Sequence, residues 1–233
     1  MKNNKPEKCI LAIGAHPDDL EFGCPVMVNN LIREGYAAYY VILTNGENGC
    51  KKKVKTVNDR ISIRKKEQLA AAKKIGVKKV YFFGEKDGFL EYKETIRKKL
   101  TLLIKALKPE LVFSFDPANQ EFTSINLFHR DHRTSALLTF DAVFAAKNEF
   151  IYPHKNGLHK VEKMYFFGTN NPNYFLDISG KIDFKLDVLS SYKSQFPDFP
   201  NFASFFKENL ISRHPDYEFS EAFRIMDIVQ ISF

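Results

Sequence analysis

An apolar run, a polar loop and a helix-type pattern follow one another four times in the first 147 residues of the chain. The apolar runs are residues 9–14, 38–44, 79–83 and 111–115, and the helical patterns are residues 20–33, 60–75, 92–107 and 129–147. Short apolar runs that alternate with helices are typical of parallel strands, because a crossover helix connects each strand to the next. The pattern therefore predicts an α/β fold with a mostly parallel central sheet and helices on both faces.

The last third of the chain is less regular. Residues 161–167 and 173–178 are predicted as strands, residues 181–194 as a helix, and residues 219–233 as a closing pair of strands. Residues 153–157 have the composition of a loop and not of a boundary between domains. We expect one domain over residues 1–233, in which a less regular C-terminal α+β extension, residues 151–233, packs on residues 1–150.

Polar loops follow all four predicted strands, in residues 15–19, 45–49, 84–88 and 116–132. The carboxyl ends of parallel strands meet at one edge of a sheet, and ligands of such sheets bind beyond that edge. We therefore expect these four loops to converge on one site, although they are far apart in the sequence.

Two of these loops carry groups that can bind a metal. Residues 16–21 (HPDDLE) follow the first strand, and residues 129–132 (HRDH) begin the helix after the fourth. Imidazole and carboxylate suit a cation such as zinc, and a catalytic zinc needs three protein ligands and an open position for water. A hydrolase also needs a carboxylate that faces the water, and the adjacent Asp18 and Asp19 can divide these roles. Alone, the first motif would also suit magnesium and the second a helix cap; together they predict a metal site.

Residues 15–24 (AHPDDLEFGC) resemble the signature of the PIG-L/LmbE-like de-N-acetylases. The resemblance continues in residues 44–49, 64–76, 83–88 and 129–133, and in the tail segments 194–195 and 220–223. It covers nearly the whole chain and is strongest over residues 10–140; the pairing of the HPDD and HxDH motifs is its specific part. It implies a Rossmann-like three-layer fold and a metal-dependent amidohydrolase that removes acetyl from an N-acetylated sugar of the N-acetylglucosamine type.

The resemblance also implies the roles of individual residues. By motif position, His16, Asp19 and His132 would be the ligands of one zinc ion per chain, and another divalent metal is compatible with the same ligands. Asp18 would be the general base that takes a proton from the metal-bound water.

The remaining catalytic groups follow from the second motif. His129, most useful as a cation, would stabilise the oxyanion, and Asp131 would orient His129 and raise its pKa. The donor of a proton to the leaving amine stays open between Asp18 and His129.

Three further residues are candidates for substrate binding. Arg64 matches a family arginine that faces the substrate pocket, although a surface position on its helix is an equal alternative. Asp87 could bind sugar hydroxyls or shape the turn before Gly88. Glu47 matches a family loop, where a structural role is favoured. Residues 116–128 should overhang the pocket, and because they match no subfamily the substrate stays open.

The family pattern also differs from this chain at one point. Members often have a glycine pair after the cysteine, whereas Pro25 and Val26 follow Cys24 here. We expect this difference to alter the first turn of the helix that follows.

Other classes of function compete with the hydrolase. A metal-dependent phosphoesterase would need a second metal, for which Asp87 and Asp116 could supply ligands. A non-catalytic sugar- or nucleotide-binding protein could keep the same fold. The net charge of +7 would suit nucleic acid, but the lysines are scattered and no groove-reading motif is present, so no nucleic-acid partner is expected.

Cysteine content and hydropathy indicate the compartment. The three cysteines form no CxxC pair, and no apolar run approaches the ~20 residues of a membrane span. We therefore expect no membrane insertion and a cytoplasmic location. The Phe-rich residues 196–206 (FPDFPNFASFF) are equally compatible with a homo-oligomer interface and with a lid or core segment.

Overall fold

The central sheet has seven strands in the order β3-β2-β1-β4-β5-β7-β6. This computed structural model describes residues 8–51, 56–119, 129–210, 212 and 214–228. The strands are β1 Cys9–Gly14, β2 Ala37–Thr44, β3 Lys79–Glu85, β4 Leu111–Phe115, β5 Lys163–Phe167, β6 Tyr174–Asp177 and β7 Ser220–Asp227. Strands β1 to β5 pair in parallel, and β7 is antiparallel to both β5 and β6. The predicted α/β fold with a mostly parallel sheet is confirmed.

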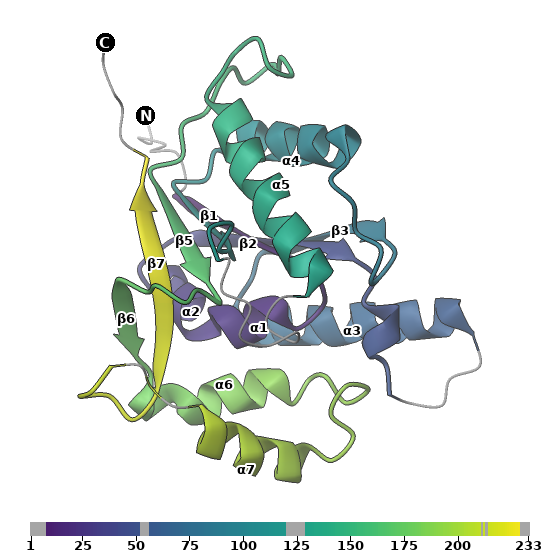
Figure 1. Ribbon diagram of the computed structural model, residues 1–233, viewed down its shortest axis with the longest axis vertical. Helices are drawn as coiled ribbons and strands as arrows, with labels where there is room; N and C mark the ends of the chain where they lie inside the picture. Colours follow the sequence, from purple (N-terminus) through teal and green to yellow (C-terminus); the bar gives the residue numbers. More distant parts are fainter. Residues whose placement is uncertain (1–7, 52–55, 120–128, 211, 213, 229–233) are drawn as a thin grey trace, which may run out of the picture.

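Helices cover both faces of this sheet (Figure 1). They are α1 Asp19–Gly23, α2 Pro25–Arg33, α3 Val57–Ile75, α4 Glu94–Leu107, α5 Arg130–Ala146, α6 Ile182–Leu189 and α7 Phe199–Asn209, with 3-10 turns at Glu47–Gly49 and Ser179–Lys181. Helices α4 and α5 lie on one face, and α1, α2 and α3 lie on the other. Helices α6 and α7 form a further layer below α1 and α3.

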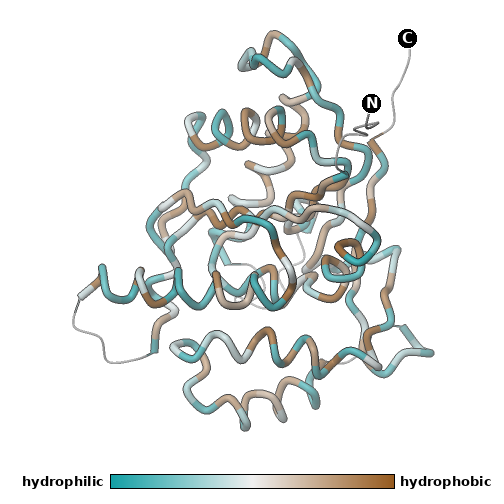
Figure 2. Tube along the Cα trace, turned by 180° about the vertical axis from the view of Figure 1, so that it is seen from behind, coloured by the Kyte–Doolittle hydropathy of each residue, from teal (hydrophilic) through white to brown (hydrophobic). Residues whose placement is uncertain are grey.

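Strand β1 shows how the sequence produces these layers. Every residue of Cys9–Gly14 is buried, because helices cover the strand on both faces. Ile10 and Ala12 belong to the core cluster that includes α2 and α3, whereas Leu11 and Ile13 belong to the cluster that includes α4 and α5. This alternation follows from the two-residue period of a strand. Hydrophobic residues concentrate along the strands in the middle of the molecule (Figure 2).

The structure differs from the predicted elements in several places. The helix predicted over residues 20–33 is two helices, because the backbone of Cys24 is not helical and Pro25 lacks an N–H group for a continuous helix. The predicted helix 181–194 ends at Leu189. Most of the Phe-rich segment forms α7, and the side chain of Asp198 caps the N-terminus of this helix.

The closing pair of strands predicted over residues 219–233 is, in its described part, the single strand β7. Residues 229–233 lie outside the described residues, as do residues 120–128 of the loop expected to overhang the pocket. Strands β5 and β7 extend the sheet of the N-terminal part, but the division into residues 1–150 and 151–233 stays a prediction.

Candidate metal centre and active site

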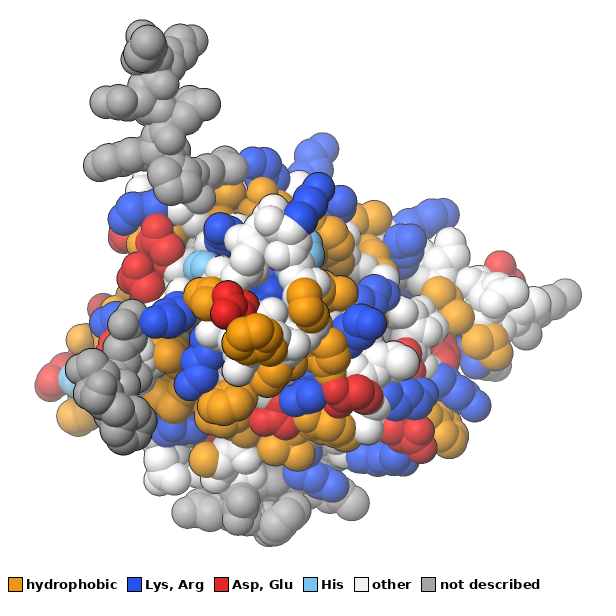
Figure 3. Space-filling model, turned by 90° about the horizontal axis from the view of Figure 1, so that it is seen from above, with side chains coloured by type: hydrophobic (Ala, Val, Ile, Leu, Met, Phe, Trp, Pro, Cys, Tyr) orange, Lys and Arg blue, Asp and Glu red, His pale blue; other side chains and the backbone are white. Residues whose placement is uncertain are grey.

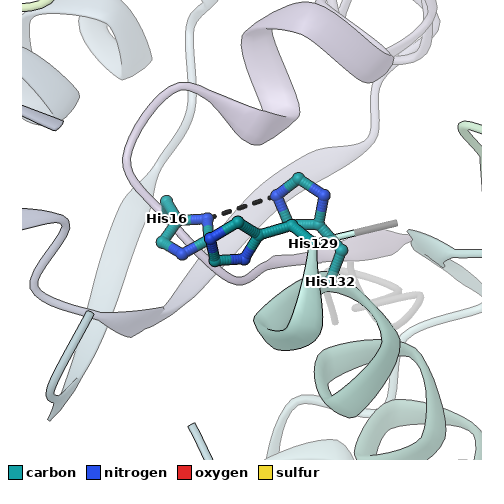
Figure 4. A group of neighbouring side chains, drawn as sticks. All are labelled: His16, His129 and His132. Carbon is teal, nitrogen blue, oxygen red and sulfur yellow. Dashed lines mark hydrogen bonds between the residues drawn. The ribbon is translucent and has the colours of Figure 1, made fainter. Parts of the chain in front are cut away.

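Three histidines meet beyond the carboxyl end of the sheet (Figure 4). His16 comes from the loop after β1, whereas His129 is the N-cap of α5 and His132 lies in its first turn. The ring centre of His16 is 4.7 Å from that of His129 and 5.1 Å from that of His132. The fold therefore brings together the two motifs that the sequence predicts to share a site.

His16, His132 and Asp19 present three donor atoms to one point. His16 Nδ1 lies 3.2 Å from His132 Nε2. Asp19 Oδ1 lies 3.1 Å from His132 Nε2, and Asp19 Oδ2 lies 3.5 Å from His16 Nδ1. Ligands about 2.0–2.1 Å from a tetrahedral zinc are about 3.3 Å apart. The three separations are close to this value, so the two ring nitrogens and the Asp19 carboxylate are candidate ligands of one tetrahedral zinc.

Backbone hydrogen bonds hold Asp19 in this arrangement. Its Oδ2 atom accepts from the N–H groups of Ala15 at 2.8 Å and His16 at 2.7 Å. Burial alone would raise the pKa of Asp19, but His132 and His16 beside it lower the pKa below its usual value. Asp19 is therefore ionised, as a metal ligand must be.

The other ring nitrogen of His16 faces two carboxylates. Nε2 lies 3.1 Å from Asp87 Oδ1 and 3.2 Å from Asp131 Oδ2. Asp131 also accepts hydrogen bonds from the backbone N–H of Gly88 at 2.7 Å and of Leu90 at 3.1 Å. A carboxylate on the second nitrogen of a metal-binding histidine fixes the ring and its tautomer. The Asp131 carboxylate thus contacts His16 and not His129, the ring that it was expected to orient.

A backbone N–H group of the same helix turn contacts the ring of His129. The N–H of Asp131 donates to His129 Nδ1 at 3.2 Å. Burial lowers the pKa of His129, and the adjacent His16 and His132 lower it further. The ring is therefore neutral at neutral pH, with its proton on Nε2, because Nδ1 accepts a hydrogen bond. This lowered pKa opposes the expected cation, and the role of His129 stays a prediction.

Asp18 lies beside the metal-binding atoms in a constrained conformation. Its φ of 100° is in the left-handed region, which costs a non-glycine residue about 1–3 kcal/mol. Arg64 Nη2 donates to Asp18 Oδ2 at 2.8 Å and to the Pro17 carbonyl, and Gln68 Oε1 accepts from the Asp18 N–H at 3.3 Å. Burial raises the pKa of Asp18 to about 6, although Arg64 opposes this shift. A carboxylate with such a pKa can accept a proton and release it again.

The three residues predicted to bind substrate have different positions. Arg64 is 1% exposed and lines the pocket, so a surface position is excluded. Asp87 also lines the pocket, where one of its oxygens is near His16 and the other accepts from the Asn48 N–H at 3.0 Å. Glu47 is buried, and its carboxylate accepts from the Asp87 N–H at 3.3 Å. This contact supports the structural role of Glu47.

A buried polar network behind Asp18 was not expected from the sequence. Gln68 Nε2 donates to Glu21 Oε1 at 2.8 Å, and the Tyr192 hydroxyl donates to Glu21 Oε2 at 2.7 Å. All three residues are fully buried. Gln68 and Tyr192 carry no recognisable motif, and only the position of Gln68 directly after the matched segment at Arg64 and Glu67 could have pointed to it.

We expect the substitution Glu21→Gln to stabilise the protein increasingly as the pH rises. Burial raises the pKa of Glu21 from 4.5 to about 7, so ionisation above pH 4.5 favours the unfolded chain until the pH passes 7. The free energy of unfolding of the variant relative to wild type should therefore increase by roughly 3 kcal/mol between pH 4.5 and pH 8. Urea denaturation at both pH values measures it, with the exposed Glu91→Gln as control. A difference independent of pH would contradict the burial argument.

These residues surround a pocket of about 620 Å³. Its lining consists of His16, Asp18, Asp19, Phe22, Gly46, Asn48, Gly49, Arg64, Asp87, His129, His132, Gln195 and Phe196. Asp116, the other carboxylate considered for a second metal, is instead bound by Arg224 through two hydrogen bonds of 2.7 and 2.5 Å. The pocket therefore combines candidate metal ligands with polar groups from four loops.

Known proteins are similar to this chain over most of its length. Residues 11–143 match the family described as PIG-L, GlcNAc-PI de-N-acetylase. A diacetylchitobiose deacetylase of Thermococcus kodakarensis is 30% identical over 208 residues, which are 85% of this chain and 75% of that protein. A probable N-acetyl-alpha-D-glucosaminyl L-malate deacetylase of Bacillus cereus is 25% identical over 196 residues, 81% of this chain and 84% of that protein. The structure of an N,N'-diacetylchitobiose deacetylase from Pyrococcus horikoshii is similar to this one, with a TM-score of 0.84 and 28% sequence identity. The superposed residues make up 94% of this chain and 84% of that chain.

Proposed function

Because the chain belongs to the PIG-L family of de-N-acetylases, we propose that it is a metal-dependent hydrolase that removes acetyl from an N-acetylglucosamine-type sugar. The observation that carries this proposal is the set of three donor atoms of His16, Asp19 and His132, which fits one tetrahedral zinc beside the buried Asp18. Zinc held there would acidify a water molecule and polarise the acetamide carbonyl.

Asp18 is the proposed general base. It accepts a proton from the attacking water, whose oxygen forms a bond to the acetamide carbon. His129 Nε2–H donates a hydrogen bond to the oxyanion that develops on the carbonyl oxygen. The C–N bond then breaks, and the sugar nitrogen takes a proton. The products are acetate and the free amine.

Asp18 is also the proposed donor of that proton. Its pKa of about 6 lets the protonated carboxyl return the proton, whereas the neutral His129 has only the Nε2 proton that it uses as a hydrogen-bond donor. Arg64 holds the Asp18 carboxylate in place through both exchanges.

The competing functions have less support. Asp87 and Asp116 were the ligands considered for the second metal of a phosphoesterase, and Arg224 already binds both oxygens of Asp116. A non-catalytic sugar-binding protein would have no use for a strained, buried carboxylate with a raised pKa beside a metal site. On the face shown in Figure 3, basic side chains are interspersed with acidic and apolar ones, and that no nucleic acid binds stays an expectation.

Two observations bear on the cellular location of the protein. None of the helices in the described part of the chain has both the length and the apolar character that crossing a bilayer requires. Among the described residues, Cys9, Cys24 and Cys50 form no disulfide bond, which suits a reducing compartment. We keep the cytoplasm as the proposed location and a homo-oligomer as an open proposal.

We expect the zinc-loaded protein to release acetate from at least one member of a panel of N-acetylglucosamine conjugates: the free sugar, its β-linked disaccharide, a glycoside and an inositol conjugate. A chelator should abolish the release, and added zinc should restore it. Acetate quantified enzymatically, with the free amine measured in parallel, tests both products. A protein that binds zinc but releases no acetate from any conjugate would contradict the proposal.

A further inference from the structure

One corner of the pocket has no part in the chemistry proposed above. It is formed by Gly49, Gln195 and Phe196, with Phe22 beside them. A Cβ atom placed on Gly49 would lie 3.7 Å from Arg64 Nη2, the atom that holds Asp18. The corner is therefore next to the proposed base.

Gln195 brings an unused acceptor to this corner. Its Oε1 atom is buried and, among the described residues, has no hydrogen-bond partner. Its backbone is fixed, because Gln195 N–H donates to the Tyr192 carbonyl at 3.0 Å. A buried acceptor without a partner costs stability, so its presence in a pocket indicates a ligand or water donor that satisfies it.

Because Gly49 has no side chain, the Gln195 amide can occupy the space next to it. Its φ is not positive, so the backbone does not require glycine there. A Cβ atom at this position would lie only 2.6 Å from Gln195 Oε1. Any side chain at position 49 would therefore displace the Gln195 amide from the corner.

Phe196 supplies an apolar surface next to this amide. Its ring stacks on Phe202 at a centroid distance of 3.9 Å, and it meets the ring of Phe22 edge-on at 5.9 Å. Phe22 also contacts Phe206 of α7 at 5.8 Å. Phe196 is half-buried and its position is fixed by its neighbours, whereas Phe205 on α7 is 63% exposed.

We infer that Gln195 and Phe196 form a subsite for a pyranose ring beside Asp18. A pyranose has an apolar face of C–H groups and a polar edge of hydroxyls, which matches an aromatic ring next to an unpaired amide oxygen. Phe196 contacts the apolar face, and Gln195 Oε1 accepts a hydrogen bond from a hydroxyl. The inference rests on the proposed function and narrows it to substrates with a sugar ring at this position. The Phe-rich segment then serves as a wall of the pocket.

The test compares Phe196→Leu, Phe196→Tyr, Gln195→Leu and Gly49→Ala with wild type, using the β-linked N-acetylglucosamine disaccharide. We expect Phe196→Leu to raise KM roughly 2- to 10-fold, the effect of one aromatic contact, with kcat and zinc content unchanged. Phe196→Tyr keeps the aromatic ring and should raise KM less than Phe196→Leu does. Gly49→Ala should reproduce the raised KM of Gln195→Leu, and Phe205→Leu is the control with no effect.

Saturation-transfer NMR with the glucosamine disaccharide, which is not turned over, separates the subsite from the reaction. We expect saturation of aromatic protons to reach the sugar C–H protons in wild type and to be lost in Phe196→Leu. If wild type shows this transfer but releases no acetate, the subsite stands and the proposed function fails. If wild type releases acetate but the Phe196 and Gln195 variants keep the wild-type KM and NMR signal, the subsite is overturned. If wild type neither binds the disaccharide nor releases acetate, both the subsite and the proposed function are overturned.

Discussion

Asp18→Asn is expected to lower kcat about 10³-fold while the protein keeps one bound metal ion. The magnitude lies within the range of about 10²–10⁴ for a positioned general base. Asparagine has nearly the same shape as aspartate, and its oxygen can still accept the hydrogen bond from Arg64. It cannot accept a proton from water. None of the three distances that define the candidate metal position involves an atom of Asp18, so the metal should remain.

Steady-state kinetics with acetate detection and metal analysis of the same preparation measure this effect. Asp116→Asn is a matched control, because Asp116 is also a buried carboxylate at the end of a strand but is bound to Arg224 away from the pocket. The control should stay within a few-fold of wild type. Loss of metal from Asp18→Asn, or wild-type turnover in that variant, would show that Asp18 is not a base separate from the metal ligands.

His132→Ala is expected to remove both the metal and measurable turnover, whereas His129→Gln should remove only part of the turnover. The two histidines are three residues apart at the start of α5. Nε2 of His132 lies within 3.2 Å of both other candidate ligands, His16 and Asp19. His129 instead offers Nε2–H as a donor, and losing one oxyanion donor costs about 10²–10³ in kcat.

Zinc titration of each apo-protein by calorimetry, followed by kinetics at saturating zinc, distinguishes the two roles. The variant His129→Gln should retain the zinc stoichiometry of wild type. The nitrogens of His16, His129 and His132 lie within 4.8 Å of one another, so a site of three histidines is the alternative. Loss of zinc from His129→Gln with retention in an Asp19→Asn variant would favour that alternative.

The alternation of strands and helices and the meeting of the two motifs could be predicted, because both follow from local patterns. Strand β1 is an uninterrupted apolar run, and the HPDD segment follows it directly. In a parallel sheet this places His16 at the same edge as the start of the helix after β4, which carries His132. No structural information is needed for that step.

The contacts around each histidine could not be predicted, because they depend on how loops from different strands pack. Asp131 is two residues from His129 in the sequence, yet its carboxylate turns toward His16 and the backbone of the loop after β3. The charge of Asp131 still raises the pKa of His129, but burial and the adjacent His16 and His132 outweigh it and lower the pKa. Gln68 and Tyr192 are ordinary residues on an amphipathic helix and beyond α6, and only the fold brings them to Glu21.

The central claim is that His16, Asp19 and His132 hold the catalytic metal. Anomalous diffraction measured on both sides of the zinc absorption edge, from a crystal grown with zinc, tests it directly. We predict one strong peak bounded by His16 Nδ1, His132 Nε2 and the Asp19 carboxylate, with Asp18 adjacent. His16 Nε2, Asp87 and Asp131 form a second group of donors within 4.8 Å of one another. A zinc peak in that group, or no peak at either position, would contradict the account.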